Sequence, residues 1–296
     1  MSRPHGPSIA AVPDIRRFAL IIGAMKSGTT SLFEYLAAHP AVAPCTVKEP
    51  NFFSDADRWA QGLDAYRRLW NWDPATHRVA LEASTNYTKR PEMDGVADRI
   101  LKADGEFRFV YIMRDPIRRM ASHLSHIAIS RGGAGTVGEA EFKRALAVSR
   151  YAMQLDAYRS HWPREAILPL VYEALRDDPL ETARQALTFF GLDAAGLDPD
   201  TVDRAHNTRT DLAADKAINR VLGGPSVLDG LRRWTPEPVL RAARTAVGWW
   251  NLHEVTLTAD QRVRAVEALR PEMARLRDEW GVDTSSWDPA LMPEAS

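Results

Sequence analysis

The chain has 296 residues, of which 45% are hydrophobic and 26% charged, and its formal net charge is -1. This composition is that of an ordinary soluble globular protein, and the balanced charge gives no support for binding to nucleic acid or to an anionic membrane. No apolar run approaches the length of a membrane span. The single cysteine, Cys45, excludes an intrachain disulfide and points to a reducing compartment.

Residues 18–40 have the pattern of a strand, a polar loop and a helix. Residues 18–22 form a short apolar run typical of a buried strand, which Gly23 ends. The loop that follows carries one lysine and four hydroxyl groups, and apolar residues then recur at helical spacing until Pro40. A helix that begins after such a loop directs free backbone N–H groups and the positive end of its dipole at an anion. We therefore expect this segment to bind a phosphate ester.

The position of the lysine separates this loop from those of ATP- and GTP-binding proteins. The NTPase loop, G-x-x-x-x-G-K-[ST], places lysine directly after its second glycine. Here Thr29 occupies that place, and Lys26 comes two residues before Gly28. The spacing G-x-x-K-S-G-T-T-S-L resembles instead the 5′-phosphosulfate loop of the sulfotransferases that use 3′-phosphoadenosine 5′-phosphosulfate (PAPS). The alternative is an ordinary strand-to-helix turn with a solvated lysine.

A second motif, R-D-P-x-x-R-x-x-S, follows the apolar run 107–113, which we predict to be a buried strand. Asp115 and Pro116 suit the N-cap and the first residue of a helix, so Arg114 is expected at the carboxyl end of a strand, where α/β sheets bind ligands. The motif resembles the 3′-phosphate site of the same families, in which the arginine and the serine, here Arg114 and Ser122, hold the 3′-phosphate of PAPS. Arginine suits this role because its planar guanidinium donates two hydrogen bonds to one phosphate. A salt bridge for Arg114 and a helix-surface position for Ser122 remain the alternative.

The run K-E-P-N-F-F-S at residues 48–54 places Glu49 just before two adjacent phenylalanines. A carboxylate held against apolar rings in a cleft can act as a base, whereas a solvated Lys-Glu pair is the alternative. The run resembles the segment of heparan-sulfate-type sulfotransferases whose glutamate is the catalytic base, which implies that role for Glu49. The resemblance also implies a catalytic role for His126, since the N-sulfotransferase branch has a histidine four residues after the serine that matches Ser122. Lone histidines are more often structural.

The resemblance is less complete elsewhere in the chain. Family members often carry a lysine where Ala83 stands, and they often close the nucleotide site with a basic loop in the last third of the chain. Arg209 or Lys216 is a candidate for that loop, although the usual lysine-glycine-arginine signature is missing. The candidate substrate contacts around the predicted strand 79–82 are Glu82, Ser84 and Tyr87.

The predicted elements make one α/β domain, with a central parallel sheet of four or five strands flanked by helices. We expect residues 1–17 to be a flexible lead-in and residues 18–296 to form the sulfotransferase domain. Residues 139–161 are predicted to form one long helix. The last helix carries an apolar stripe at spacings of three and four, which predicts that this face packs on the core.

The resemblance implies a sulfotransferase that moves the sulfuryl group of PAPS, by in-line displacement, to a hydroxyl or amine of a carbohydrate or small-molecule acceptor. Glu49 would act as the base, and Lys26, with His126, would stabilise the charge on the leaving oxygen. No metal is expected, because a sulfuryl group carries less charge than a terminal phosphoryl group. The residues expected to bind the 5′-phosphate are Lys26, Ser27, Gly28, Thr29, Thr30 and Ser31.

Two alternatives to this function remain at this stage. One is a small-molecule kinase that uses ATP and Mg²⁺, and the other is a nucleotide-binding protein without catalytic activity. Golgi sulfotransferases carry a membrane anchor, and no such segment is seen in the sequence. A cytoplasmic, bacterial enzyme is therefore the expectation.

Overall fold

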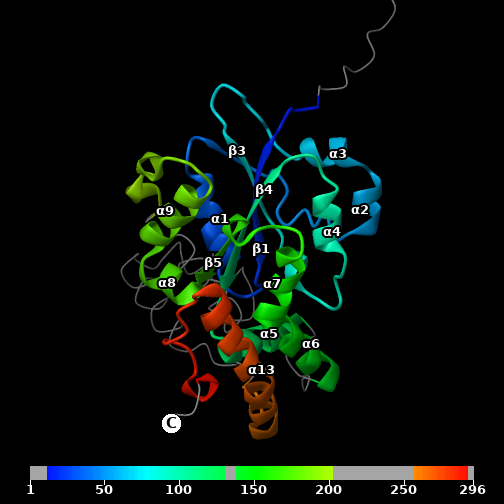
Figure 1. The fold of residues 1–296 in the computed structure, drawn as a ribbon, viewed down its shortest axis with the longest axis vertical. Coiled ribbons are helices and arrows are strands. Elements are labelled where there is room, and N and C mark those ends of the chain that lie inside the picture. Colours follow the sequence, from blue (N-terminus) through cyan, green and yellow to red (C-terminus); the bar gives the residue numbers. More distant parts are fainter. Residues whose placement is uncertain (1–11, 131–137, 203–255, 293–296) are drawn as a thin grey trace, which may run out of the picture.

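The structure, a computed structural model, describes residues 12–130, 138–202 and 256–292 (Figure 1). Its described part is built on one sheet of five strands in the order β2-β3-β1-β4-β5, and all neighbouring strands are parallel. The strands are β1 (Arg17–Gly23), β2 (Val42–Pro44), β3 (Val79–Ala83), β4 (Glu106–Met113) and β5 (Ile167–Val171). The predicted α/β architecture with a central parallel sheet is confirmed.

Strand β1 lies in the middle of the sheet and is apolar on both faces, as expected of a strand that helices cover from both sides. Phe18, Leu20 and Ile22 belong to one hydrophobic core, whereas Ala19 and Ile21 belong to the other. This alternation follows from the two-residue period of side chains along a strand.

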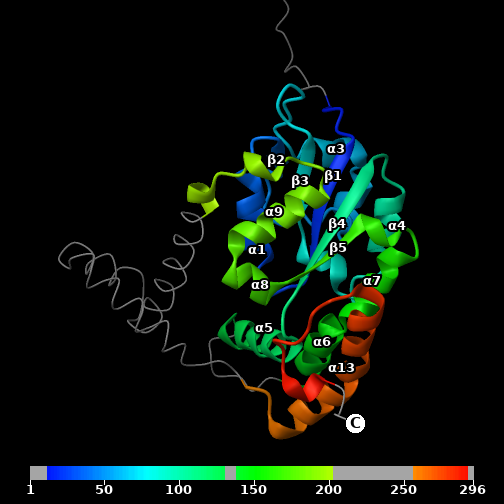
Figure 2. The same cartoon turned by 60° about the vertical axis from the view of Figure 1, so that its left-hand side comes forward.

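Helices cover both faces of the sheet, as Figure 2 shows. One face carries α1 (Thr29–Ala37), α8 (Tyr172–Asp177) and α9 (Pro179–Phe189). The other face carries α2 (Ala56–Ala60), α3 (Leu63–Arg67), α4 (Val96–Leu101), α5 (Pro116–Ser130), α6 (Glu139–Ser149), α7 (Tyr151–Arg159) and α13 (Ala259–Trp280). None of the helices in the described ranges has the length and hydrophobicity needed to cross a bilayer.

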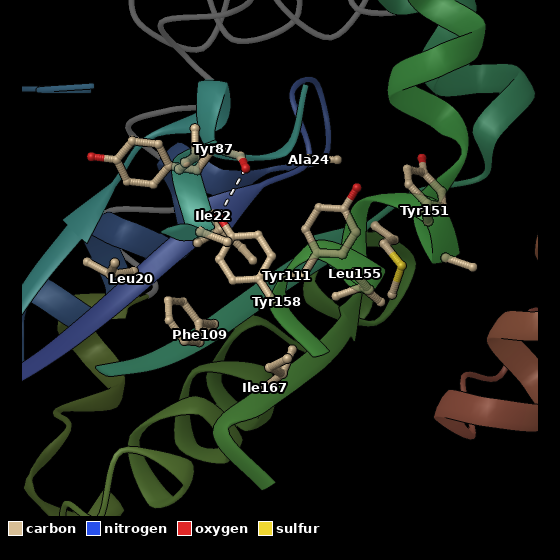
Figure 3. Packing of buried hydrophobic residues seen from close by; sticks show 14 of the residues in the cluster. Leu20, Ile22, Ala24, Tyr87, Phe109, Tyr111, Tyr151, Leu155, Tyr158 and Ile167 are labelled. Atoms are coloured by element: carbon tan, nitrogen blue, oxygen red, sulfur yellow. Dashed lines mark hydrogen bonds between the residues drawn. The ribbon is translucent and has the colours of Figure 1, made fainter. Parts of the chain in front are cut away.

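Aromatic rings fill the core between β4 and α7 (Figure 3). Phe109 of β4 packs edge to face on Tyr158 of α7, with their ring centroids 5.0 Å apart. The Tyr158 hydroxyl donates a hydrogen bond of 2.9 Å to the backbone carbonyl of Tyr87, which lies just beyond β3. This buried bond attaches the segment after β3 to the helical layer.

The prediction of one long helix over residues 139–161 is wrong. The backbone leaves the helical region at Arg150 (φ −80°, ψ 73°), and this break separates α6 from α7. The Arg150 guanidinium pairs with Glu272 of α13 at 3.3 Å, and the same carboxylate accepts a hydrogen bond of 3.0 Å from the backbone N–H of Met153. Packing against α13 therefore stabilises the break, and local periodicity carries no signal for it.

The last helix, α13, packs on the core as predicted. It begins with a capping box, in which the Thr258 hydroxyl accepts from the Gln261 N–H while the Gln261 side chain accepts from the Thr258 N–H. Its apolar stripe is buried and comprises Val266, Leu269, Met273, Leu276 and Trp280.

Candidate active site

The candidate site lies where the carboxyl ends of the parallel strands meet, the usual ligand-binding edge of an open α/β sheet. Residues from the ends of four neighbouring strands contribute to it. They are Lys26 after β1, Thr85 after β3, Arg114 after β4 and Tyr172 after β5.

The loop between β1 and α1 has the geometry of an anion-binding turn. The Ala24 N–H donates to the Ile112 carbonyl at 2.7 Å, which attaches the start of the loop to β4. Lys26 (φ 70°) and Gly28 (φ 86°) both have left-handed backbone conformations. Gly28 is the N-cap of α1, no described side chain caps this end of the helix, and its first turn holds no acidic residue. The first N–H groups of α1 are thus available to an anion.

Tyr172 connects the loop to the second predicted anchor. A Cβ atom on Gly28 would lie only 2.7 Å from Cδ2 of the Tyr172 ring. The guanidinium carbon of Arg114 lies 5.0 Å from the centroid of the same ring, in cation–π contact. The tyrosine ring therefore contacts both predicted phosphate anchors.

The positive groups of the site repel one another. Burial lowers the pKa of Lys26, and the charge of Arg114 lowers it further. Arg114 Nε and Ser27 Oγ are buried and have no hydrogen-bond partner within the described part of the chain. Two neighbouring cations and two unpaired donors fit a ligand with more than one negative group, as a doubly phosphorylated nucleotide has.

Asp115 begins α5 as the sequence predicts. Its Oδ1 accepts hydrogen bonds from the N–H groups of Ile117 (2.8 Å) and Arg118 (3.0 Å), which is N-cap geometry. Ser122 lies further along α5 and is half-buried. The cap fixes where α5 starts, so it sets the direction in which the helix leaves Arg114.

Glu49 lies beside the start of α1. A small pocket is lined by Glu49 together with Thr29 and Thr30 of the loop-helix junction. The Thr85 hydroxyl, from the short 3₁₀ helix η1 (Thr85–Thr88) after β3, donates to Glu49 Oε2 at 3.3 Å. The carboxylate predicted to be the base thus stands next to the predicted phosphosulfate loop.

The family model described as "Sulfotransferase family" matches residues 19–196, which is more than half of the chain. The chain belongs to the sulfotransferase family. This confirms the resemblance inferred from the loop and from the R-D-P-x-x-R-x-x-S motif.

Two curated relatives of this sulfotransferase are heparan sulfate enzymes. Human heparan sulfate glucosamine 3-O-sulfotransferase 6 is 28% identical over 206 residues, covering 64% of this chain and 58% of that enzyme. Mouse heparan sulfate glucosamine 3-O-sulfotransferase 3B1 is 27% identical over 187 residues, covering 59% of this chain and 46% of that enzyme. The chain thus spans about half the length of the curated relatives it matches.

A solved structure shows the same fold. The crystal structure of a sulfotransferase from Alicyclobacillus acidocaldarius superposes with a TM-score of 0.60 and 23% sequence identity, covering 92% of this chain and 98% of that chain.

One face of α5 brings further polar side chains to the site of this sulfotransferase. Arg119, Ser122, His123 and His126 follow at spacings of three and four, so they share one side of the helix. His126 is exposed, and partial burial together with the charge of Lys26 lowers its pKa. The histidine that the resemblance implies therefore lies near the loop lysine.

His123 and Lys89 were not singled out from the sequence. Burial and the charges of Arg119, Lys89, His126 and Lys26 lower the pKa of His123 to about 3, so its imidazole is neutral at neutral pH. Its Nδ1 is buried and has no hydrogen-bond partner among the described residues. Burial also lowers the pKa of Lys89, which donates to Asn86 Oδ1 at 2.6 Å. The spacing of four residues after Arg119 was the available signal for His123, whereas no sequence pattern marked Lys89.

Arg119 contacts the loop between β1 and α1 from the protein interior. Its side chain is fully buried and donates from Nε to Ser149 Oγ at 2.8 Å and to the carbonyl of Ala145. It also donates to the Met25 carbonyl at 3.5 Å, just before Lys26. No carboxylate in the described ranges forms an ion pair with it. Its charge therefore adds to the positive potential of the site.

The structure does not place Glu82, Ser84 and Tyr87 as substrate contacts. All three side chains are buried, with exposed fractions of 0%, 0% and 2%. The alternation of side chains along β3 and the turn of η1 direct them into the protein rather than into the cleft.

Arg209 and Lys216, the candidates for a closing basic loop, lie outside the described residues. Within the described ranges, no group of three or more His, Cys, Asp or Glu side chains is placed to hold a metal ion. The expectation of metal-free chemistry stays a prediction.

Proposed function

We propose that this chain is a PAPS-dependent sulfotransferase that acts on a hydroxyl or amine of a carbohydrate or small-molecule acceptor. The observation that carries the proposal is that the Tyr172 ring contacts both the loop of Lys26 and the Arg114 guanidinium, which brings two cations together whose repulsion a bound anion would relieve. Each belongs to a motif that resembles the site of one PAPS phosphate. Family membership supports the same reaction class.

Donor binding would use the two ends of the site separately. Lys26 and the N–H groups at the start of α1 would bind the 5′-phosphate, and Arg114 with Ser122 would bind the 3′-phosphate. ATP has no 3′-phosphate, so the second anchor would favour PAPS over ATP. Tyr172 would keep Arg114 in position, since its ring faces the guanidinium.

The transfer step would use Glu49 as the general base. As the bond between the acceptor atom and sulfur forms, the acceptor proton would pass to the Glu49 carboxylate. The bond between sulfur and the 5′-phosphate oxygen would break, and its electron pair would stay on that oxygen. Lys26 would stabilise the charge developing there, because its ammonium lies in a partly buried position where electrostatic interactions are stronger than in water.

A sugar hydroxyl is the first acceptor to test. Both curated relatives are 3-O-sulfotransferases of heparan sulfate glucosamine. The neutral His123 and the half-buried Lys89 near Glu49 would supply hydrogen bonds to a polar acceptor.

The experiment is incubation with labelled PAPS and a panel of glucosamine-containing oligosaccharides, phenols and alcohols, with detection of sulfated products by mass. We expect a sulfated product with the parent and turnover reduced by about 10²- to 10⁴-fold in Glu49→Gln. Lys48→Ala is the matched control, because Lys48 is the exposed neighbour of Glu49.

Thermal shift distinguishes this proposal from the kinase and from a binding protein without activity. A ligand stabilises in proportion to its affinity, so 3′-phosphoadenosine 5′-phosphate (PAP) should raise the melting temperature, whereas ATP with Mg²⁺ should not. Stabilisation by ATP and Mg²⁺ alone would reject the proposal. Stabilisation by PAP without turnover of any acceptor would support the alternative of a nucleotide-binding protein without catalytic activity.

A further inference from the structure

The turn that carries Glu49 has an unusual backbone. Glu49 (φ 47°) and Asn51 (φ 53°) both have left-handed conformations, which non-glycine residues seldom adopt. Asn51 Nδ2 donates to the Glu49 carbonyl at 2.9 Å within the turn. A conformation of this kind persists only where surrounding contacts determine it.

Two buried hydroxyl groups, those of Ser84 and Tyr87, accept hydrogen bonds from the backbone of this turn. The Asn51 N–H donates to Ser84 Oγ at 3.0 Å, and the Phe53 N–H donates to the Tyr87 hydroxyl at 3.3 Å. Each hydroxyl in turn donates a hydrogen bond to the same atom, Glu82 Oε1, at 2.7 Å from Ser84 and 2.6 Å from Tyr87. One carboxylate oxygen is therefore connected to two backbone N–H groups of the turn.

The direction of these bonds depends on the carboxylate. A hydroxyl has one proton, and an ionised carboxylate only accepts. Because Glu82 accepts hydrogen bonds from the Ser84 and Tyr87 hydroxyls, both hydroxyl oxygens are left to accept from the turn. If a donor group stood in place of Glu82, each hydroxyl would accept from it and turn its own O–H toward the turn. The hydroxyl proton would then face the N–H group of Asn51 or Phe53, and the hydrogen bond to the turn would be lost.

Glu82 has no countercharge among the described residues. Its side chain is fully buried, and its second oxygen, Oε2, accepts from the Tyr66 hydroxyl at 2.7 Å. Burial raises the pKa of Glu82, while the hydrogen bonds from Tyr87, Tyr66 and Ser84 oppose that change. Burying a carboxylate without a cation is unfavourable, so a role in conformational specificity is the natural explanation.

We propose that Glu82 is a positioning residue for sulfuryl transfer, which orients Ser84 and Tyr87 so that they fix the turn bearing Glu49. The inference rests on the proposed role of Glu49 as the base. Thr85 belongs to the same hydrogen-bonded network, because it follows Ser84 in the chain and its hydroxyl donates to Glu49 Oε2. Glu82 fixes the backbone conformation of the turn through Ser84 and Tyr87, and Thr85 fixes the orientation of the Glu49 carboxylate.

The test compares variants at the two oxygens of Glu82. Ser84→Ala removes the link from Oε1 to the turn. Tyr66→Phe removes only the hydroxyl that donates to Oε2 and keeps the ring that packs on Phe52 and Phe53. Tyr87→Phe is a second variant on the Oε1 side. Steady-state kinetics give kcat and the KM for PAPS, and trypsin cleavage after the exposed Lys48 reports on the turn without any need for activity.

We expect Ser84→Ala and Tyr87→Phe to lower kcat about tenfold or more with an unchanged KM for PAPS, and to speed cleavage after Lys48. Tyr66→Phe should lose thermal stability but keep the parental kcat and cleavage rate. A parental kcat and cleavage rate in both Ser84→Ala and Tyr87→Phe would overturn the inference, and so would an equal fall of kcat in Tyr66→Phe. If the parent sulfates no acceptor, the proposed function fails, and the cleavage rates still decide whether the two hydroxyls bonded to Glu82 hold the turn.

Discussion

Replacing Gly28 with alanine places a methyl group where the structure has no room for one. At φ 86° an L-residue is less stable than glycine by roughly 1–2 kcal/mol. The new Cβ would also lie 2.7 Å from the Tyr172 ring, which must move away from Arg114. Loss of that cation–π contact adds about 0.5–2 kcal/mol. We expect Gly28→Ala to lower the free energy of unfolding by roughly 1.5–4 kcal/mol in total.

Gly95→Ala is the matched control. Gly95 is also the N-cap of a helix, α4, with φ 74° and ψ 6°, close to the φ 86° and ψ 12° of Gly28. The nearest atom to a Cβ there is 4.0 Å away, so alanine meets no clash. This variant should show the backbone cost alone, about 1–2 kcal/mol.

The assay is urea unfolding of both variants together with calorimetric titration of PAP. Displacement of Arg114 removes a hydrogen bond to a charged group, about 1.5–3 kcal/mol, so Gly28→Ala should bind PAP about 10- to 100-fold more weakly. Gly95→Ala should bind it with the parental affinity. Equal losses of stability in the two variants, with unchanged PAP affinity in both, would refute the coupling of loop and arginine through Tyr172.

Three further predictions concern separate parts of the chain. Arg114→Ala should raise the Kd for PAP about 10- to 100-fold while the Kd for adenosine 5′-phosphate, measured by the same titration, changes little, because only the 3′-phosphate contact is lost. The pKa of His123 is about 3 in the folded protein, below its ordinary value of 6.5, so the unfolded state alone takes up a proton there as the pH falls below 6.5. Stability should therefore drop on acidification, and His123→Asn should reduce the fall in melting temperature between about pH 7.5 and about pH 5; an unchanged fall would contradict this assignment. Thr258→Ala should lower the free energy of unfolding by about 1 kcal/mol through loss of the capping box and leave turnover unaffected, which melting curves and the sulfation assay would check.

The elements that carry the two predicted phosphate anchors could be found from the sequence because their signals are local. The run before Gly23 and the helical spacing after the loop predict β1 and α1, and both form. Asp115 and Pro116 predict the start of α5, and the N-cap hydrogen bonds confirm it. Propensity, hydrophobic period and capping act over a few residues, so a linear pattern records them.

Other parts of the site depend on which strands are neighbours. Met113 and Val171 are paired in the register of β4 and β5, and this pairing is what brings Tyr172 beside Arg114. Glu82, Ser84 and Tyr87 were expected to contact substrate, but they lie beneath the turn of Glu49 because β3 is adjacent to β1 and its side chains alternate between the faces.

Three features could be inferred from the sequence by itself: the family, the strand-loop-helix segment with its lysine, and the arginine after β4. Each depends on a short run of neighbouring residues, so a linear pattern is enough to reveal it. Tertiary structure alone decided that a buried carboxylate lies under the turn of Glu49, that an uncharged histidine stands among four cationic or titratable side chains, and that one tyrosine ring contacts both anchors. These features arise where strands and helices distant in the chain pack together, and burial changes the chemistry of a side chain only after that packing exists.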